Sequence, residues 1–309
     1  MRKSVIALSM VSALGLIVSG CGTASQTANQ SSNGTSTTGA NGNDTQTTKT
    51  SGSKKISIAW LGWTEDVAVT HLWKDILESQ GYQVNLTQMD LGPMFLGLSQ
   101  NNTSIFLDAW LPSDNPYVNK YKSNLTSLGV WYTGDSNQGI AVPQYMNNIN
   151  TMEDLNSHAS EFQNRIVGIE PGSEEDNAVK KMISVYGMNN MSLQESSTTA
   201  MLSSLQHAYE QHQPIAVVMW TPHWAFVKYH LKFIKDPKKI LAGQSSITIE
   251  ANKEWAQSNP QVAKWFQNFK LNANQLASLE EAVKDQSDQD AAAKKWIQSN
   301  QALVNSWLK

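Results

Sequence analysis

The sequence predicts an α/β fold of two lobes followed by a helical C-terminal segment. Apolar stretches with strand-like alternation and amphipathic helical stretches follow one another through residues 55–240. Residues 253–308 are expected to be helical, with a break at Pro260. No internal sequence repeat recurs at a fixed period.

The first α/β set begins with a strand, a helix and a second strand, as in a βαβ crossover. Thr64 is the expected N-cap of the helix, and Glu65 and Asp66 occupy its first turn, where acidic side chains are favourable. Gly81 is expected to end this helix. A short helix is expected at 93–98. The strands expected in this part of the chain are 55–61, 82–86, 104–110 and 139–143.

A second set of alternating strands and helices is expected after residue 150. A helical turn at 151–155 precedes a strand, and Gly187 is expected to stop the long helix that begins near Glu174. The strands expected in this set are 165–169 and 214–220, and the helices are 174–186 and 198–212. Strands and helices therefore continue to alternate, which supports a second α/β lobe.

The N-terminal residues have the pattern of a secretion signal. Two basic residues precede the apolar stretch 5–18, which is too short for a transmembrane helix and typical of a secretory signal peptide at residues 1–20. Small residues before Cys21 resemble the lipobox of bacterial lipoproteins, where this cysteine is lipidated; the alternative is a plain signal peptide with an incidental cysteine. Residues 21–54 are expected to form a polar, flexible tether. We expect a lipid anchor on the extracytoplasmic face of the cell membrane.

Composition excludes several other classes of protein. The chain has 23 Lys and Arg against 26 Asp and Glu, which argues against nucleic acid as a partner. Only Arg2 and Arg165 are arginines, so no arginine cluster can clamp an anion. The single cysteine excludes an intramolecular disulfide and a cysteine-based metal site. We expect no cofactor and no metal.

Tryptophan is unusually frequent: 11 Trp against 8 Tyr and 7 Phe. Trp63, Trp110 and Trp220 each follow or close an expected strand, where ligands of open α/β sheets bind. Each could instead plug the core, as we expect for Trp60 and Trp73. Aromatic faces attract cations, above all quaternary ammonium groups. Sugars also stack on tryptophan, but they need a dense fringe of polar side chains.

The loop before the helix at Glu174 is a candidate anion site. Backbone N–H groups at a helix N-terminus bind anions, and Gly172 allows a ligand to approach closely. The alternative is that Ser173 and Asp176 form an ordinary capping arrangement. The acidic side chains at 174–176 would also weaken the attraction for an anion.

Several segments together resemble the substrate-binding lipoproteins of ABC importers for glycine betaine and related compatible solutes. The segments run in order through the folded part: Trp63-Thr64-Glu65, Gly92-Pro93-Met94, Ala109-Trp110-Leu111-Pro112, Val142-Pro143-Gln144-Tyr145-Met146, Gly168-Ile169-Glu170-Pro171-Gly172-Ser173 and Trp220-Thr221-Pro222-His223-Trp224. The resemblance implies a periplasmic-binding-protein-like fold (type II, Venus-flytrap) with the ligand cleft between two lobes. It implies lobe I at 55–141 plus 231–309 and lobe II at 142–230.

The resemblance also implies roles for individual residues. Members hold a trimethylammonium group in a cage of three tryptophans, which correspond to Trp63, Trp110 and Trp220. They hold the ligand carboxylate through backbone N–H groups, here those of Gly172, Ser173, Glu174 and Glu175. Asn115 stands where some members have a histidine that contacts the ligand. Further candidates at the site are His223 and Trp224.

The sequence therefore predicts a monomeric binding protein that captures glycine betaine or a related quaternary ammonium solute and delivers it to an ABC permease. A choline or carnitine binder is the nearer alternative, because of the acidic run 174–176. The rival class is a hydrolase or another carbohydrate-handling surface lipoprotein. An enzyme would need a nucleophile with a base, or paired carboxylates. No histidine lies in a hydrolase motif, and alternation and a solvated turn explain Asp108 and Asp114.

Overall fold

The computed structural model of the protein describes residues 54–241, 244–284 and 286–309. The expected signal peptide, the lipidated Cys21 and the tether up to residue 53 lie outside the described residues. Within the described ranges, no helix combines the length and the apolar character that crossing a membrane requires.

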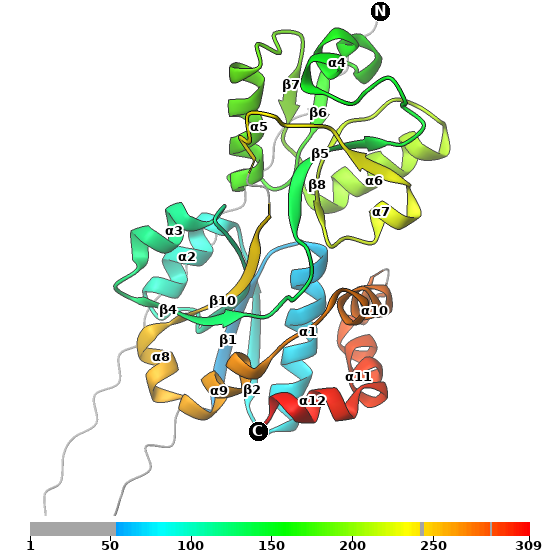
Figure 1. The fold of residues 1–309 in the computed structure, drawn as a ribbon. Helices are drawn as coiled ribbons and strands as arrows, with labels where there is room; N and C mark the ends of the chain where they lie inside the picture. Colours follow the sequence, from blue (N-terminus) through cyan, green and yellow to red (C-terminus); the bar gives the residue numbers. More distant parts are fainter. Residues whose placement is uncertain (1–53, 242–243, 285) are drawn as a thin grey trace, which may run out of the picture. The chain divides into compact units, whose positions relative to one another are not determined.

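The first lobe is built on a five-stranded sheet in the order β2-β1-β3-β10-β4 (Figure 1). Strands β1, β2 and β3 run parallel, and β10 lies antiparallel between β3 and β4. The parallel part confirms the βαβ crossover that the sequence predicts. The strand bounds are β1 Lys55–Trp60, β2 Gln83–Gln88, β3 Ile105–Leu111, β4 Leu125–Val130 and β10 Ser246–Asn252.

The C-terminal helices belong to this first lobe, where Figure 1 shows them beside α1 and the sheet. Trp73 of α1 is fully buried and packs its ring against Phe266 and Phe269, so this part of the core joins α1 to the C-terminal region. The helix bounds are α1 Thr64–Ser79, α2 Leu91–Ser99, α3 Asn115–Tyr121, α8 Lys253–Ser258, α9 Pro260–Asn268, α10 Ala273–Val283, α11 Gln289–Ser299 and α12 Gln301–Trp307. Pro260 begins α9, which confirms the expected break.

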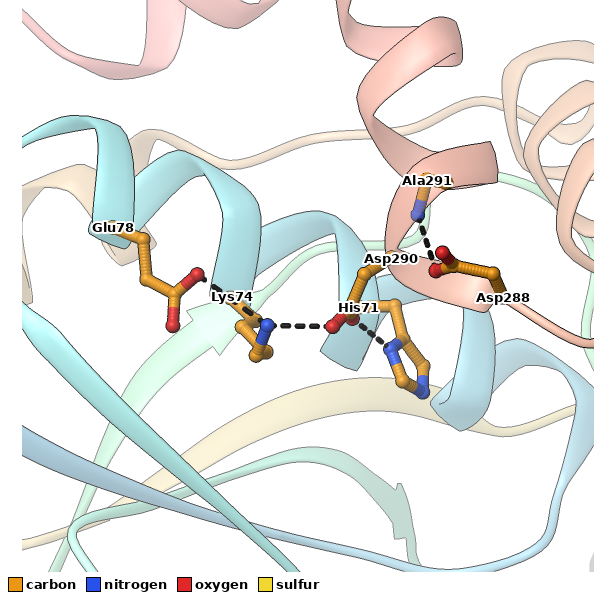
Figure 2. Close-up of polar contacts among 6 residues, drawn as sticks. All are labelled: His71, Lys74, Glu78, Asp288, Asp290 and Ala291. Atoms are coloured by element: carbon orange, nitrogen blue, oxygen red, sulfur yellow. Dashed lines mark hydrogen bonds and ion pairs between the residues drawn. The ribbon is translucent and has the colours of Figure 1, made fainter.

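Polar contacts add to this attachment (Figure 2). Asp290 of α11 accepts a hydrogen bond from Lys74 at 2.6 Å and contacts His71, and both partners lie on α1. Asp288 caps α11 by accepting the N–H of Ala291. Because Asp290 is only partly exposed, its charge is screened less than in a surface pair. The contacts therefore support the docking of α11 on α1.

The second lobe is built on a sheet in the order β7-β6-β8-β5-β9. Strands β6, β7 and β8 are parallel, whereas β5 runs antiparallel to β8 and β9. The strand bounds are β5 Asn137–Pro143, β6 Arg165–Val167, β7 Ser192–Gln194, β8 Val217–Thr221 and β9 Leu231–Phe233. The α-helix bounds are α4 Met152–Ser157, α5 Glu174–Val185, α6 Thr198–Glu210 and α7 Ala225–Lys228, and a 3₁₀ helix covers Ala159–Phe162. The chain is an α/β protein with two sheets, as predicted.

The sheet topology gives lobe boundaries that differ from those predicted from the sequence. Strands β5 and β9 both belong to the second sheet, so boundaries at 141/142 and 230/231 would leave most of β5 and all of β9 in the wrong lobe. The chain crosses between the lobes after β4 and returns before β10. Ser136 and Ser245 lie in these two connections, and the N–H of Ser245 donates to the carbonyl of Ser136 at 2.9 Å. The boundary prediction was wrong because Pro143 marks the end of β5 and not the crossing.

Two further expectations need correction. Thr64 is the first residue of α1 and not its N-cap; Trp63 occupies the cap position without a side-chain cap. Trp60 is half-buried at the edge of the core, where its ring contacts His71. Trp73 is in the core as expected, and the four C-terminal tryptophans, to which the sequence assigned no site, are also buried.

Candidate functional site

The structure brings Trp63, Trp110 and Trp220 together around one space. Trp63 and Trp110 come from the first lobe and Trp220 from β8 of the second, and their exposed fractions are 3%, 2% and 3%. The cavity that the surrounding side chains leave between them is small, about 10 Å³. The space, which we call the cage, is lined by Trp63, Glu65, Trp110, Gln138, Ile169, Glu175 and Trp220.

Each of the three indole N–H groups donates a hydrogen bond to a carboxylate. Trp63 Nε1 donates to Glu170 Oε2 at 3.1 Å, and Trp220 Nε1 donates to Glu65 Oε2 at 2.8 Å. Trp110 Nε1 lies 3.4 Å from Asp108 Oδ2. A carboxylate at the positive edge of an indole fixes the ring orientation and leaves the negative face free. These hydrogen bonds therefore hold the three rings by their edges and leave the ring faces without a hydrogen-bond partner.

Two of these carboxyl groups are fully buried and interact. Glu65 and Asp108 have no exposed surface, and burial raises the pKa of Glu65 to about 7. Burial, together with the nearby charges of Glu65 and Asp66, raises the pKa of Asp108 well above its ordinary value. Because burial raises the pKa of both groups and the charge of Glu65 raises that of Asp108 further, the two carboxyl groups are not both favoured as carboxylates. The pair places at most about one net negative charge behind Trp110 and Trp220.

The loop before α5 forms the capping arrangement that the sequence offered as an alternative to an anion site. Ser173 Oγ accepts the N–H of Asp176 at 3.2 Å, and the N–H of Ser173 donates to the carbonyl of Glu170 at 3.1 Å. Gly172 is exposed and has a left-handed φ of 89°. Of the four loop residues expected to meet a ligand, only Glu175 lines the cage.

Glu175 enters the cage with its side chain. It is 4% exposed, and one carboxylate oxygen accepts a hydrogen bond from the amide of Gln138 on β5. Its own backbone N–H also bonds the carboxylate, while Oε2 has no hydrogen-bond partner among the described residues. Burial raises the pKa of Glu175 to about 7, and the neighbouring carboxylates act in the same direction. The cage thus contains a second carboxyl group that is half protonated near neutral pH.

The three further candidates lie outside the lining of the cage. Asn115 is half-buried at the start of α3. His223 is buried and contacts the Trp220 ring edge-on, with centroids 5.1 Å apart, so it positions that ring. Trp224 lines a separate groove, where Lys284 Nζ lies 4.8 Å from its ring centroid.

His223 also joins the two lobes. Its Nδ1 accepts the N–H of Ala225 at 3.1 Å, which leaves the N–H on Nε2 to donate to Thr64 Oγ1 at 2.9 Å. Burial first, and then the charge of Lys284, lower the pKa of His223 to about 3, so the ring is neutral.

Sequence reasoning missed the carboxyl groups around the cage. Glu65 was assigned to the helix dipole, although it lies two residues after Trp63 and becomes fully buried. Glu170 accepts the N–H groups of Thr198 and Trp63, and Gln138 lies on β5. The local signal was the acidic residues beside Trp63 and Trp110, and that signal is also expected of solvated helix ends.

Comparison with known proteins gives a consistent result. A family model described as "Substrate binding domain of ABC-type glycine betaine transport system" matches residues 54–299. The glycine betaine/carnitine transport binding protein GbuC of Listeria monocytogenes is 37% identical over 144 residues, which cover 46% of this chain and 48% of that protein. The chain therefore aligns with about half the length of this relative. The glycine betaine/proline betaine-binding periplasmic protein of Escherichia coli is 25% identical over 288 residues, 79% of this chain and 86% of that protein.

Solved structures agree on the architecture. Lactococcal OpuAC, in its closed-liganded conformation with glycine betaine, is 29% identical with a TM-score of 0.76 and covers 82% of this chain and 99% of that one. An ABC-transporter choline binding protein in complex with choline has a TM-score of 0.77 at 20% identity, covering 82% of this chain and 91% of that one, and shows the fold alone. These neighbours are two-lobed, as the sequence predicts for this chain.

Proposed function

The chain belongs to the family of substrate-binding domains of ABC-type glycine betaine transport systems, and from this premise we propose that it captures a quaternary ammonium solute between Trp63, Trp110 and Trp220. The family consists of substrate-binding transport proteins and not of enzymes. On this proposal the chain delivers its ligand to the membrane permease of an ABC importer. The second end of the ligand meets the start of α5, from Gly172 to Glu175.

One observation carries the proposal: three buried indole rings line one space, with a carboxyl group at the N–H of each. A quaternary ammonium group cannot donate hydrogen bonds, so it loses little when aromatic faces replace water. A sugar would need many more polar partners than Gln138 and two carboxyl groups provide. The geometry therefore favours the cation over a carbohydrate.

Contacts across the cage suggest how the ligand is enclosed. Trp63 and Glu170 come from different lobes, as do Trp220 and Glu65. Ser113 donates to Gln138 Oε1 at 2.7 Å, again between lobes. Lobes that separate would break these bonds and expose the cage, so the ligand would favour the closed arrangement by touching both sides. We propose that the permease recognises this closed arrangement.

The ligand on this proposal is glycine betaine or a close relative, with choline and carnitine as alternatives. The two curated relatives above carry names that include glycine betaine, carnitine and proline betaine. A thermal-shift screen with glycine betaine, proline betaine, carnitine, choline and neutral sugars tests it. We expect at least one quaternary ammonium solute to raise Tm and to change tryptophan fluorescence, while the sugars do neither. A response to sugars alone would contradict the proposal.

We further propose that Cys21 carries a lipid that holds the protein on the extracytoplasmic face of the cell membrane, and that the protein works as a monomer. Its support is the apolar stretch and the small residues that precede this cysteine in the sequence. Cys21→Ser, in a chain whose signal peptide is still cleaved, should be released from the membrane fraction into the medium or the periplasm, because the acyl groups are the proposed anchor. Membrane fractionation checks it, and a variant that stays membrane-bound would contradict the anchor.

A further inference from the structure

The side chain of Glu175 is the feature of the cage that the proposed function leaves unexplained. It comes from α5, is almost fully buried, and lines the same space as the three tryptophans. Gln138 satisfies one of its oxygens, whereas Oε2 has no hydrogen-bond partner among the described residues. A buried carboxyl oxygen without a donor is costly unless a ligand or a proton completes it.

The charges around Glu175 disfavour a ligand carboxylate. Among the described residues, no Lys, Arg or His lines the cage, whereas Glu65 and Glu175 both do. The backbone N–H groups expected to bind an anion are also partly occupied. That of Ser173 donates to the carbonyl of Glu170, and that of Glu175 donates to its own carboxylate. An ionised Glu175 would therefore repel a carboxylate at the second end of the ligand.

We propose that Glu175 determines which second end of a quaternary ammonium ligand this site accepts. As a carboxylate, it accepts a hydrogen bond from the hydroxyl of an amino-alcohol cation. As a carboxylic acid, it donates a hydrogen bond to the carboxylate of a zwitterion. This inference rests on the proposed function, since it takes the ammonium group to lie between the tryptophans. A zwitterion then binds together with a proton on Glu175, whereas an amino-alcohol cation needs none.

The groups that act on Glu175 are all acidic. Glu65 of α1 lines the same space, Asp114 precedes α3, and Glu174 and Asp176 flank Glu175 on α5. From β5 it meets only the uncharged amide of Gln138. Burial and these charges favour its protonated form, which brings its titration to about pH 7. Both forms are therefore populated under ordinary conditions.

Calorimetry with three probes at pH 6 and pH 8.5 tests this proposal. Tetramethylammonium reports on the head group alone, choline adds a hydroxyl, and glycine betaine adds a carboxylate that stays ionised over this range. We expect the affinity for glycine betaine, relative to tetramethylammonium, to fall by at least about tenfold from pH 6 to pH 8.5, because Glu175 must hold a proton. The affinity for choline, relative to that for tetramethylammonium, should stay constant or rise from pH 6 to pH 8.5.

Two variants sharpen the test. Glu175→Gln keeps the shape and stays neutral at both pH values, so its relative affinity for glycine betaine should fall far less from pH 6 to pH 8.5 than that of the wild type and should exceed the wild-type value at pH 8.5. Some pH dependence remains, because Glu65 still titrates in this variant. Glu195→Gln removes one charge from an exposed residue of the same lobe and should retain the wild-type pH dependence. Binding of tetramethylammonium shows that each variant is folded.

The outcomes separate this inference from the proposed function. If all three probes bind but the ratio of glycine betaine to choline affinity is equal at both pH values, the role of Glu175 is overturned while the cage stands. A Glu175→Gln variant with the wild-type ratio at both pH values overturns it equally. If none of the three probes binds the wild-type protein, the proposed function fails and this inference fails with it. Should Glu175→Gln not fold, the pH dependence of the wild type decides.

Discussion

Replacing Trp63, Trp110 or Trp220 with alanine is expected to weaken the binding of a quaternary ammonium solute by about fivefold to thirtyfold each, because a desolvated cation–π contact contributes roughly 1–2 kcal/mol. The loss should be larger for Trp63 and Trp220. Their indole N–H groups also bond Glu170 and Glu65 across the lobes, so truncation removes a hydrogen bond that holds the two sides of the cage together. Calorimetry with tetramethylammonium and with glycine betaine measures both effects.

Trp73→Ala is the matched control, because Trp73 is the same residue type buried away from the cage. Its ring centroid lies 4.2 Å from that of Phe266 and 5.4 Å from that of Phe269. Truncation should lower the free energy of unfolding by about 3–5 kcal/mol and leave the affinity unchanged. Unchanged affinity in all three cage variants would contradict the cage. An equal loss in Trp73→Ala would show that the cage variants act through stability alone.

The free energy of unfolding is expected to fall as the pH rises from about 5 to 8 in the absence of ligand, opposite to the usual behaviour of paired carboxylates. Burial raises the pKa of Glu65 and of Glu175 to about 7, from 4.5 in the unfolded chain. The folded state therefore binds protons more tightly than the unfolded state. The stability that these protonated groups contribute is complete below about pH 4.5 and is lost as the pH rises through about 7. For Glu175 alone the loss is roughly 3 kcal/mol by pH 8.

His223 acts in the other direction at lower pH. Burial and Lys284 lower its pKa to about 3, so the contribution of the neutral ring is lost as the pH falls from about 6.5 through 3. Stability should therefore be greatest under mildly acidic conditions. Chemical denaturation at pH 5, 6, 7 and 8 checks the trend.

A variant of Glu65 tests whether the buried carboxyl groups cause the loss of stability with rising pH. Glu65→Gln can still accept the N–H of Trp220, and it should flatten the decline between pH 5 and pH 8 because it cannot ionise. Glu195→Gln, on the surface, should keep the decline. A wild-type protein that becomes more stable from pH 5 to pH 8 would show that folding does not raise the pKa values of Glu65 and Glu175.

Much of the fold follows from local patterns. Strands β1, β3 and β8 and helices α1, α5 and α6 lie close to their predicted positions, because alternation and helical periodicity are properties of short segments. Strand β10 was missed. It is buried along all but its first residue, so it shows no alternation, and it is completed by pairing with β3 and β4 more than a hundred residues earlier.

The lobe boundary also depends on long-range strand pairing and not on a local pattern. Which sheet β5 and β9 join depends on their partners, since β5 pairs with β8 and β9 and not with a strand of the first sheet. Hydrogen-bond partners far apart in the chain leave no mark on the local pattern of residues. Only the assembled sheets show that the crossing lies between β4 and β5.

The tryptophan excess that marks this sequence was enough to select Trp63, Trp110 and Trp220, because a large ring at the end of a strand is visible in a single segment. The sequence alone also determined the family motifs around these residues and the α/β class. The tertiary structure decided which carboxyl groups stand behind the rings and which enter the cage. Glu65 meets Trp220 and Glu175 meets Gln138 only after folding, and burial, which sets their protonation, is a property of the whole surrounding shell of residues.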